Sequence, residues 1–115
     1  MNILCLEDDA LVGGVLCDLM RDLGHDVVYC TTGHEALHQL SESRGFDVLV
    51  TDIHLRGGVD SRSVVQLARE SGARLPVIYI TGDMSVQDIA PGDQILRKPC
   101  TLGKLDAALS SVRAR

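Results

Sequence analysis

Short apolar stretches alternate with segments of helical periodicity along the whole chain, and this alternation is the feature that most constrains the fold. The apolar stretches predict five strands, at residues 2–6, 26–30, 47–51, 75–80 and 94–97. Helical spacing predicts helices at 10–23, after Thr32, at 61–71 and after Thr101. Strands that alternate with helices form βαβ units, so we expect a parallel sheet with helices on both faces.

The size of the chain suits a single domain of this kind. With 115 residues it can bury a single core without disulfides or metals, and it contains no linker or repeat, so residues 1–115 are expected to form one domain. Right-handed crossovers favour a doubly wound α/β sandwich of three layers, flavodoxin-like, with strand order 2-1-3-4-5. Between residues 83 and 93 the helical pattern is broken by Pro91-Gly92, which predicts a shortened fourth helix.

Composition excludes several classes of protein. The net charge is −5 without any basic run, which argues against direct nucleic-acid binding. No stretch is long and apolar enough to span a membrane, and Met1 leads straight into a strand without a signal-peptide pattern. The four cysteines form no Cys-x-x-Cys pair, so they indicate buried free thiols in a reducing cytoplasm rather than a zinc site.

Polar residues follow the predicted strands where each strand ends. Glu7 and Asp8 follow the first strand, Asp52 the third, Thr81 the fourth and Lys98 the fifth. In open α/β sheets the carboxyl ends of the strands form the active-site crevice, and strands one and three flank its centre. Three clustered carboxylates repel one another unless a cation relieves them. Hard oxygen ligands completed by water are typical of Mg²⁺.

In this order and spacing the residues resemble the receiver domains of two-component response regulators, and the resemblance covers the whole chain. It implies that Asp52 is the phosphoacceptor, that Lys98 contacts the phosphoryl group, and that the Thr81 hydroxyl moves to bond it. It further implies a cis peptide at Lys98–Pro99. The Mg²⁺ ligands implied are Glu7, Asp8, Asp52 and the backbone carbonyl of His54.

The function implied is that of a phosphorylation switch in bacterial two-component signalling. Such a domain takes its phosphoryl group from a histidine kinase or a phosphotransfer protein and then changes its binding to a downstream protein or output domain. It catalyses only its own phosphorylation and dephosphorylation, so we do not expect a turnover enzyme. The chemistry fits, because phosphoryl transfer requires positioning and charge neutralisation, here by Mg²⁺ and Lys98.

The sequence departs from the family pattern at the switch. A proline usually stands four residues after the phosphoacceptor, where this chain has Arg56, and the aromatic switch position is Ile95. Signalling is therefore expected to involve Thr81 and the segment 83–93, which we predict to be mobile until phosphorylation orders it. His54 and Asp83 can hydrogen-bond water and are expected to tune the rate of hydrolysis.

Two other classes of function are weighed against this one. A pseudo-receiver that only binds partners would be expected to lack one of the acids or the lysine, and none is lost. A small phosphatase with Asp52 as nucleophile would need a second general acid and a substrate lid, and the sequence offers no clear candidate for either.

Overall fold

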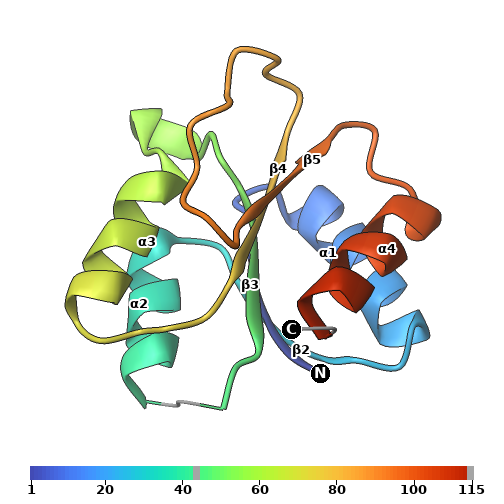
Figure 1. The fold of residues 1–115 in the computed structure, drawn as a ribbon, viewed down its shortest axis with the longest axis horizontal. Helices are drawn as coiled ribbons and strands as arrows, with labels where there is room; N and C mark the ends of the chain where they lie inside the picture. The colour runs from blue at the N-terminus through green and yellow to red at the C-terminus, as the bar shows by residue number, and fades with distance from the viewer. Residues whose placement is uncertain (43–44, 114–115) are drawn as a thin grey trace.

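The computed structural model describes residues 1–42 and 45–113, in which a five-stranded parallel sheet lies between two layers of helices (Figure 1). Neighbouring strands are parallel throughout, and their order in the sheet is β2-β1-β3-β4-β5, as predicted. The strands are β1 (Asn2–Leu6), β2 (Asp26–Cys30), β3 (Val48–Asp52), β4 (Val77–Thr81) and β5 (Gln94–Arg97).

Two helices cover each face of the sheet. Helices α1 (Ala10–Asp22) and α4 (Leu102–Arg113) lie on one face, and α2 (Gly33–Glu42) and α3 (Ser61–Glu70) on the other (Figure 1). Side chains alternate between faces along a strand. Ile3 and Cys5 of β1 therefore join the core under α1 and α4, whereas Leu4 and Leu6 join the core under α2 and α3.

The central strands β3 and β4 are buried along their full lengths, as their apolar sequences predict for strands covered on both faces. Both strands are shifted relative to the prediction. Strand β3 runs from Val48 to Asp52 instead of 47–51, and β4 from Val77 to Thr81 instead of 75–80. Strand β4 begins after Pro76, whose missing N–H cannot join a sheet ladder. All four cysteines are free, and Cys5, Cys17 and Cys30 are buried.

The apolar residues of helix α1 only partly face the sheet. Leu11, Val12 and Val15 are exposed, Leu11 to 84%, whereas Leu16 is buried and Leu19 packs against the core. The buried positions are Gly13, Leu16, Cys17 and Met20. Gly13 lies so close to Tyr29 that a Cβ there would be 2.4 Å from the phenol oxygen. Close approach at the glycine thus sets the rotation of the helix.

The predicted helix starts are confirmed by capping contacts. Asp9 caps α1 by accepting the backbone N–H groups of Leu11 and Val12. The Thr32 hydroxyl accepts the Glu35 N–H at the start of α2, and Thr101 accepts the Lys104 N–H at the start of α4. Leu102, the first residue of α4, is 44% exposed.

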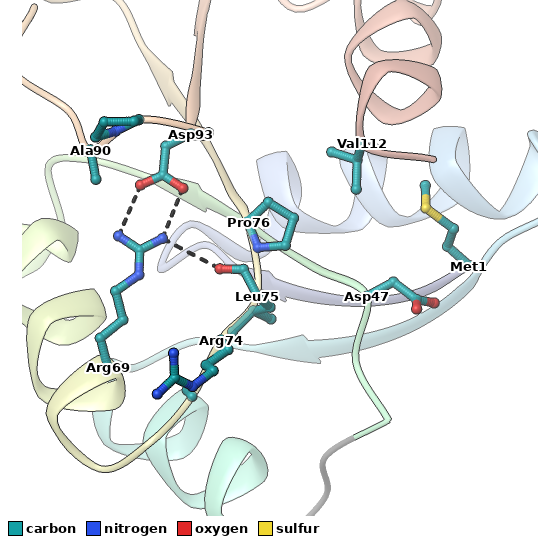
Figure 2. A pocket seen from close by; sticks show the side chains of 12 residues that line it. Met1, Asp47, Arg69, Arg74, Leu75, Pro76, Ala90, Asp93 and Val112 are labelled. Atoms are coloured by element: carbon teal, nitrogen blue, oxygen red, sulfur yellow. Dashed lines mark hydrogen bonds and ion pairs between the residues drawn. The ribbon is translucent and has the colours of Figure 1, made fainter. Parts of the chain in front are cut away.

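The connection between β4 and β5, residues 82–93, contains no helix, whereas at most a short one was expected. Two apolar side chains anchor this segment: Val86 is buried, and Ile89 packs against the core under α2 and α3. At its far end Asp93 forms a two-bond ion pair with Arg69 of α3, at 2.8 and 2.9 Å (Figure 2). None of the described helices is long and apolar enough to cross a lipid bilayer.

Candidate functional site at the carboxyl ends of the strands

The parallel register brings the predicted site residues to one edge of the sheet. Asp52 is the last residue of β3 and Thr81 the last of β4, and the pairs Asp52–Ile80 and Thr81–Arg97 place the two strand ends side by side. Glu7 and Lys98 each follow directly after a strand that neighbours one of these. The sheet topology alone therefore gathers side chains that are distant in the sequence.

Asp52 and Lys98 form the central ion pair of the site. The Lys98 Nζ lies 3.0 Å from Asp52 Oδ2, and Asp52 is only 8% exposed. The Lys98 backbone N–H donates to the Thr81 carbonyl, and the Lys98–Pro99 peptide is cis, as predicted. An ammonium group on a nearly buried carboxylate is positioned to neutralise negative charge that is added to that carboxylate.

Glu7 lies beside Asp52 and is 3% exposed. Burial raises the pKa of Glu7 to about 7, and the negative charge of Asp52 adds to the rise. The Asp9 N–H donates to Glu7 Oε1 at 3.1 Å and partly opposes the effect. Glu7 and Asp52 are thus two largely buried carboxyl groups side by side, and the Lys98 ammonium contacts Asp52. A hard divalent cation fits this donor chemistry.

Asp8 is directed toward Arg56 instead of joining these two acids. Asp8 Oδ2 accepts the backbone N–H of Arg56 and lies 3.7 Å from the Nε of its guanidinium. Within residues 1–42 and 45–113, no group of three or more His, Cys, Asp or Glu side chains is placed to hold a metal ion. In this conformation Glu7 and Asp52 are adjacent, and Asp8 has a cation of its own.

Thr81 is buried, and its hydroxyl oxygen accepts the Asp83 N–H at 3.0 Å. This contact joins the end of β4 to the segment 82–93. Rotation of the Thr81 hydroxyl toward Asp52 would alter its hydrogen bond with the Asp83 amide. Thr81 therefore stands where chemistry at Asp52 can be transmitted to that segment.

The side chains of His54 and Asp83 contact each other at the exposed side of the site. This contact was not evident from the sequence. His54 Nε2 lies 3.1 Å from Asp83 Oδ2, and the His54 backbone N–H donates to Asp52 Oδ1 at 3.3 Å. Hydrogen bonds from the Ser85 hydroxyl and amide, followed by His54, lower the pKa of Asp83 to about 2. The two residues predicted to influence water near Asp52 thus form one pair.

Ile95 lies on β5 opposite Tyr79 of β4, partly buried against the core under α2 and α3. The Tyr79 ring is buried, which raises the pKa of its phenol to about 12. Neither residue offers an exposed ring whose hydroxyl could move between two positions. How the switch works without an aromatic residue at Ile95 stays a prediction.

Tyr29 is a site residue that sequence reasoning missed. Its hydroxyl donates to the Glu7 carbonyl at 2.6 Å, so the end of β2 holds the backbone of the acidic loop. A signal was present, because the Gly13-Gly14 pair inside a helical pattern indicates a close approach. Arg56 was noted only for the proline it replaces, and nothing in the sequence indicated its contact with Asp8.

Comparison with known proteins agrees with this geometry. Residues 3–110 match the model of the response regulator receiver domain. The transcriptional regulatory protein QseB of Escherichia coli O157:H7 is 30% identical over 120 residues, covering 100% of this chain and 54% of that protein. The response regulator protein PmrA of Pseudomonas aeruginosa is 34% identical over 122 residues, covering 100% and 53%. The chain thus spans about half the length of these curated relatives.

Solved structures show the same architecture. The receiver domain of the hybrid histidine kinase CckA has a TM-score of 0.83 at 28% identity, covering 97% of this chain and 98% of that one. A two-component response regulator from Clostridium difficile has a TM-score of 0.86 at 22% identity, covering 100% and 97%, and supports the fold alone. With a family model that matches nearly the whole chain, this protein belongs to the response regulator receiver domain family.

Proposed function

We propose that Asp52 accepts a phosphoryl group in a Mg²⁺-dependent reaction and that this modification switches partner binding. The observation that carries the proposal is the contact of Lys98 Nζ with Asp52 Oδ2 at 3.0 Å, beside buried Glu7. An Asp52 oxygen attacks the phosphorus of a phosphohistidine, the donor's N–P bond breaks, and the imidazole leaves with a proton from solvent. The new bond is an acyl phosphate.

The residues around Asp52 have separate roles in this proposal. Lys98 neutralises charge on the phosphoryl oxygens as they arrive. Glu7, Asp8, Asp52 and the His54 carbonyl would hold Mg²⁺, which supplies charge neutralisation and orientation of the phosphoryl group. Thr81 donates its hydroxyl to a phosphoryl oxygen and draws the segment 82–93 with it, because its oxygen already contacts the Asp83 amide.

The lifetime of the acyl phosphate depends in this proposal on the His54–Asp83 pair. Both side chains are polar and lie at the exposed side of Asp52, where the hydrolytic water enters. Alanine at either position removes a hydrogen-bonding site for that water, so the phosphorylated protein should persist severalfold longer. The decay of labelled phosphoprotein measures this, and wild-type decay in both variants would contradict the assignment.

The partners are proposed from the relatives. Regulators such as QseB and PmrA, and the sensor protein EvgS of Escherichia coli O157:H7, which is 29% identical over 97% of this chain, contain segments similar to it. We therefore propose a histidine kinase or phosphotransfer protein as donor and a downstream protein or output domain as receiver of the signal. The free buried thiols fit a reducing compartment, and we propose the cytoplasm.

The test is phosphorylation by a small acyl phosphate with Mg²⁺, followed by intact mass measurement and peptide mapping. One phosphoryl group, acid-stable and base-labile, is expected at Asp52. Asp52→Asn should abolish this modification, and Lys98→Ala should reduce the response to the acyl phosphate. Asp22→Asn, at the exposed end of α1, should leave the modification unchanged. Absence of modification in the wild-type protein would favour the pseudo-receiver, and modification at Ser, Thr or His would refute the mechanism. Release of free phosphate from many substrate molecules would favour the phosphatase.

A further inference from the structure

The three acids of the site differ in what compensates their charge. Asp52 contacts Lys98, and Glu7 receives the Asp9 N–H and lies next to Asp52. Asp8 alone contacts an arginine, and that arginine stands outside the strand ends that build the rest of the site. Asp8 is 16% exposed at its side chain, so this contact is partly shielded from solvent.

Arg56 reaches Asp8 from a short turn after β3. The turn η1 (Arg56–Gly58) is closed by the Leu55 N–H bonding to the Val59 carbonyl, and Gly57 and Gly58 have φ values of +75° and +74°. Left-handed backbone at two successive positions is accessible at low cost only to glycine. The turn therefore presents both the backbone N–H and the guanidinium of Arg56 to the same carboxylate oxygen, Asp8 Oδ2.

We propose that Arg56 is an internal counter-cation for Asp8, which lowers the affinity of the site for divalent metal and couples metal binding to the η1 turn. This inference rests on the proposed Mg²⁺ site. A cation bound at Asp8 meets the positive guanidinium within a few ångströms and competes with it for the same carboxylate. Metal binding therefore displaces the Arg56 side chain and perturbs its backbone hydrogen bond.

The side chain of Arg56 is 79% exposed, which limits the size of the effect. An exposed ion pair of this kind alters an equilibrium by about two- to fivefold at moderate ionic strength. The same exposure means that replacing the guanidinium leaves the fold intact. Because solvent ions screen exposed charges, the difference between the variant and the wild-type protein should shrink as salt is added.

The test is the affinity for Mn²⁺ and Mg²⁺ of Arg56→Gln, Arg56→Lys and the wild-type protein, measured by electron paramagnetic resonance and calorimetry. Arg56→Gln should bind metal about two- to fivefold more tightly, and Arg56→Lys should remain near wild type because it keeps the charge. Arg74→Gln is the matched control. It removes the same charge from an exposed residue in the loop before β4, at the opposite edge of the sheet, and should change nothing.

Nuclear magnetic resonance gives a second readout. The Arg56 amide should shift during metal titration of the wild-type protein, and unfolding curves check that each variant folds. Unchanged metal affinity in Arg56→Gln, with weaker binding in Asp8→Asn, overturns this inference while leaving the metal site in place. Equal affinity in Asp8→Asn and wild type, or no binding to the wild-type protein, overturns the metal site and the inference together.

Discussion

Glu7 and Asp8 are neighbours in the sequence, yet the fold gives their carboxyl groups different surroundings. Glu7 is buried beside Asp52, whereas Asp8 turns toward Arg56. The sequence predicts that the clustered carboxylates of Glu7, Asp8 and Asp52 repel one another in the metal-free protein. In the structure this repulsion concerns Glu7 and Asp52, because Asp8 already has a positive partner and Glu7 lies beside another acid.

The pH dependence of stability should show this difference. Because the pKa of Glu7 is raised from 4.5 to about 7 in the folded protein, the folded state binds this proton more tightly than the unfolded chain. Glu7 therefore contributes stability that is fully present below about pH 4.5 and is lost as the pH rises through about 7. Without metal, the loss should be about 3 kcal/mol.

Urea unfolding across this range, with a chelator present, measures the loss. Glu7→Gln should flatten the curve, and added Mg²⁺ should raise wild-type stability most at the upper end of the range. Glu42→Gln, at the exposed end of α2, is the control and should follow the wild-type curve. An unchanged slope in Glu7→Gln would show that its carboxyl is not the group that titrates.

At the scale of elements, the packing of α1 against β2 supports the acidic loop. Tyr29 of β2 fills the space above Gly13, and its hydroxyl bonds to the Glu7 carbonyl. The helix cannot rotate to bury Leu11 and Val15 without losing the glycine that admits the ring. Helix α1 thus leaves apolar residues exposed while Tyr29 fixes the loop that follows β1.

Adjacent glycines in α1 provide a matched pair of variants. In Gly13→Ala the new Cβ would lie 2.4 Å from the Tyr29 phenol oxygen, so the ring must move and its bond to Glu7 is lost. We expect a loss of about 1–3 kcal/mol in the free energy of unfolding. Nothing lies within 4 Å of a Cβ at Gly14. Gly14→Ala should therefore gain about 0.5–1 kcal/mol, because glycine is a poor helix residue.

Chemical denaturation of both variants measures these changes. Equal effects of the two substitutions would mean that helix propensity, and not the Tyr29 contact, governs this part of α1. Metal affinity should also fall in Gly13→Ala and stay unchanged in Gly14→Ala, since only the first displaces the support of the acidic loop.

Across the whole molecule, the segment 82–93 links the site to the opposite edge of the sheet. Arg97 of β5 donates to the carbonyls of Asp83 and Val86 near the site. At the other end Asp93 bonds to Arg69 of α3 (Figure 2). The Asp93 carboxylate also accepts the backbone N–H of Val77. Between these anchors the chain forms no helix, and its backbone has turn hydrogen bonds such as that from the Asp93 N–H to the Ala90 carbonyl, which places it among the less stable parts of the domain.

Hydrogen exchange should detect ordering of this segment. Amides of residues 84–92 should exchange quickly in the unmodified protein and more slowly with Mg²⁺ and a phosphoryl mimic such as beryllium fluoride, because Thr81 draws the segment toward Asp52. Amides of β3, buried throughout, are the internal control. Slow exchange in both states would mean a rigid connection and would point to the η1 turn as the signalling surface.

The sequence by itself determined the order of the elements, the sheet topology and the identity of the residues at the strand ends. These depend on local apolar periodicity and on the rule that parallel strands bring their carboxyl ends together. Asp52, Lys98 and Thr81 could therefore be placed at one edge of the sheet without coordinates, and the cis Lys98–Pro99 peptide followed from the resemblance to the family.

Only the tertiary structure decided how α1 is rotated and which cation Asp8 contacts. The rotation depends on Tyr29 meeting Gly13, and the contact of Asp8 with Arg56 joins residues 48 positions apart. Neither follows from periodicity, because an apolar pattern records the hydrophobicity of a face and not the shape of the surface opposite it. The sequence likewise does not indicate which carboxylate a turn will bring close to an exposed arginine.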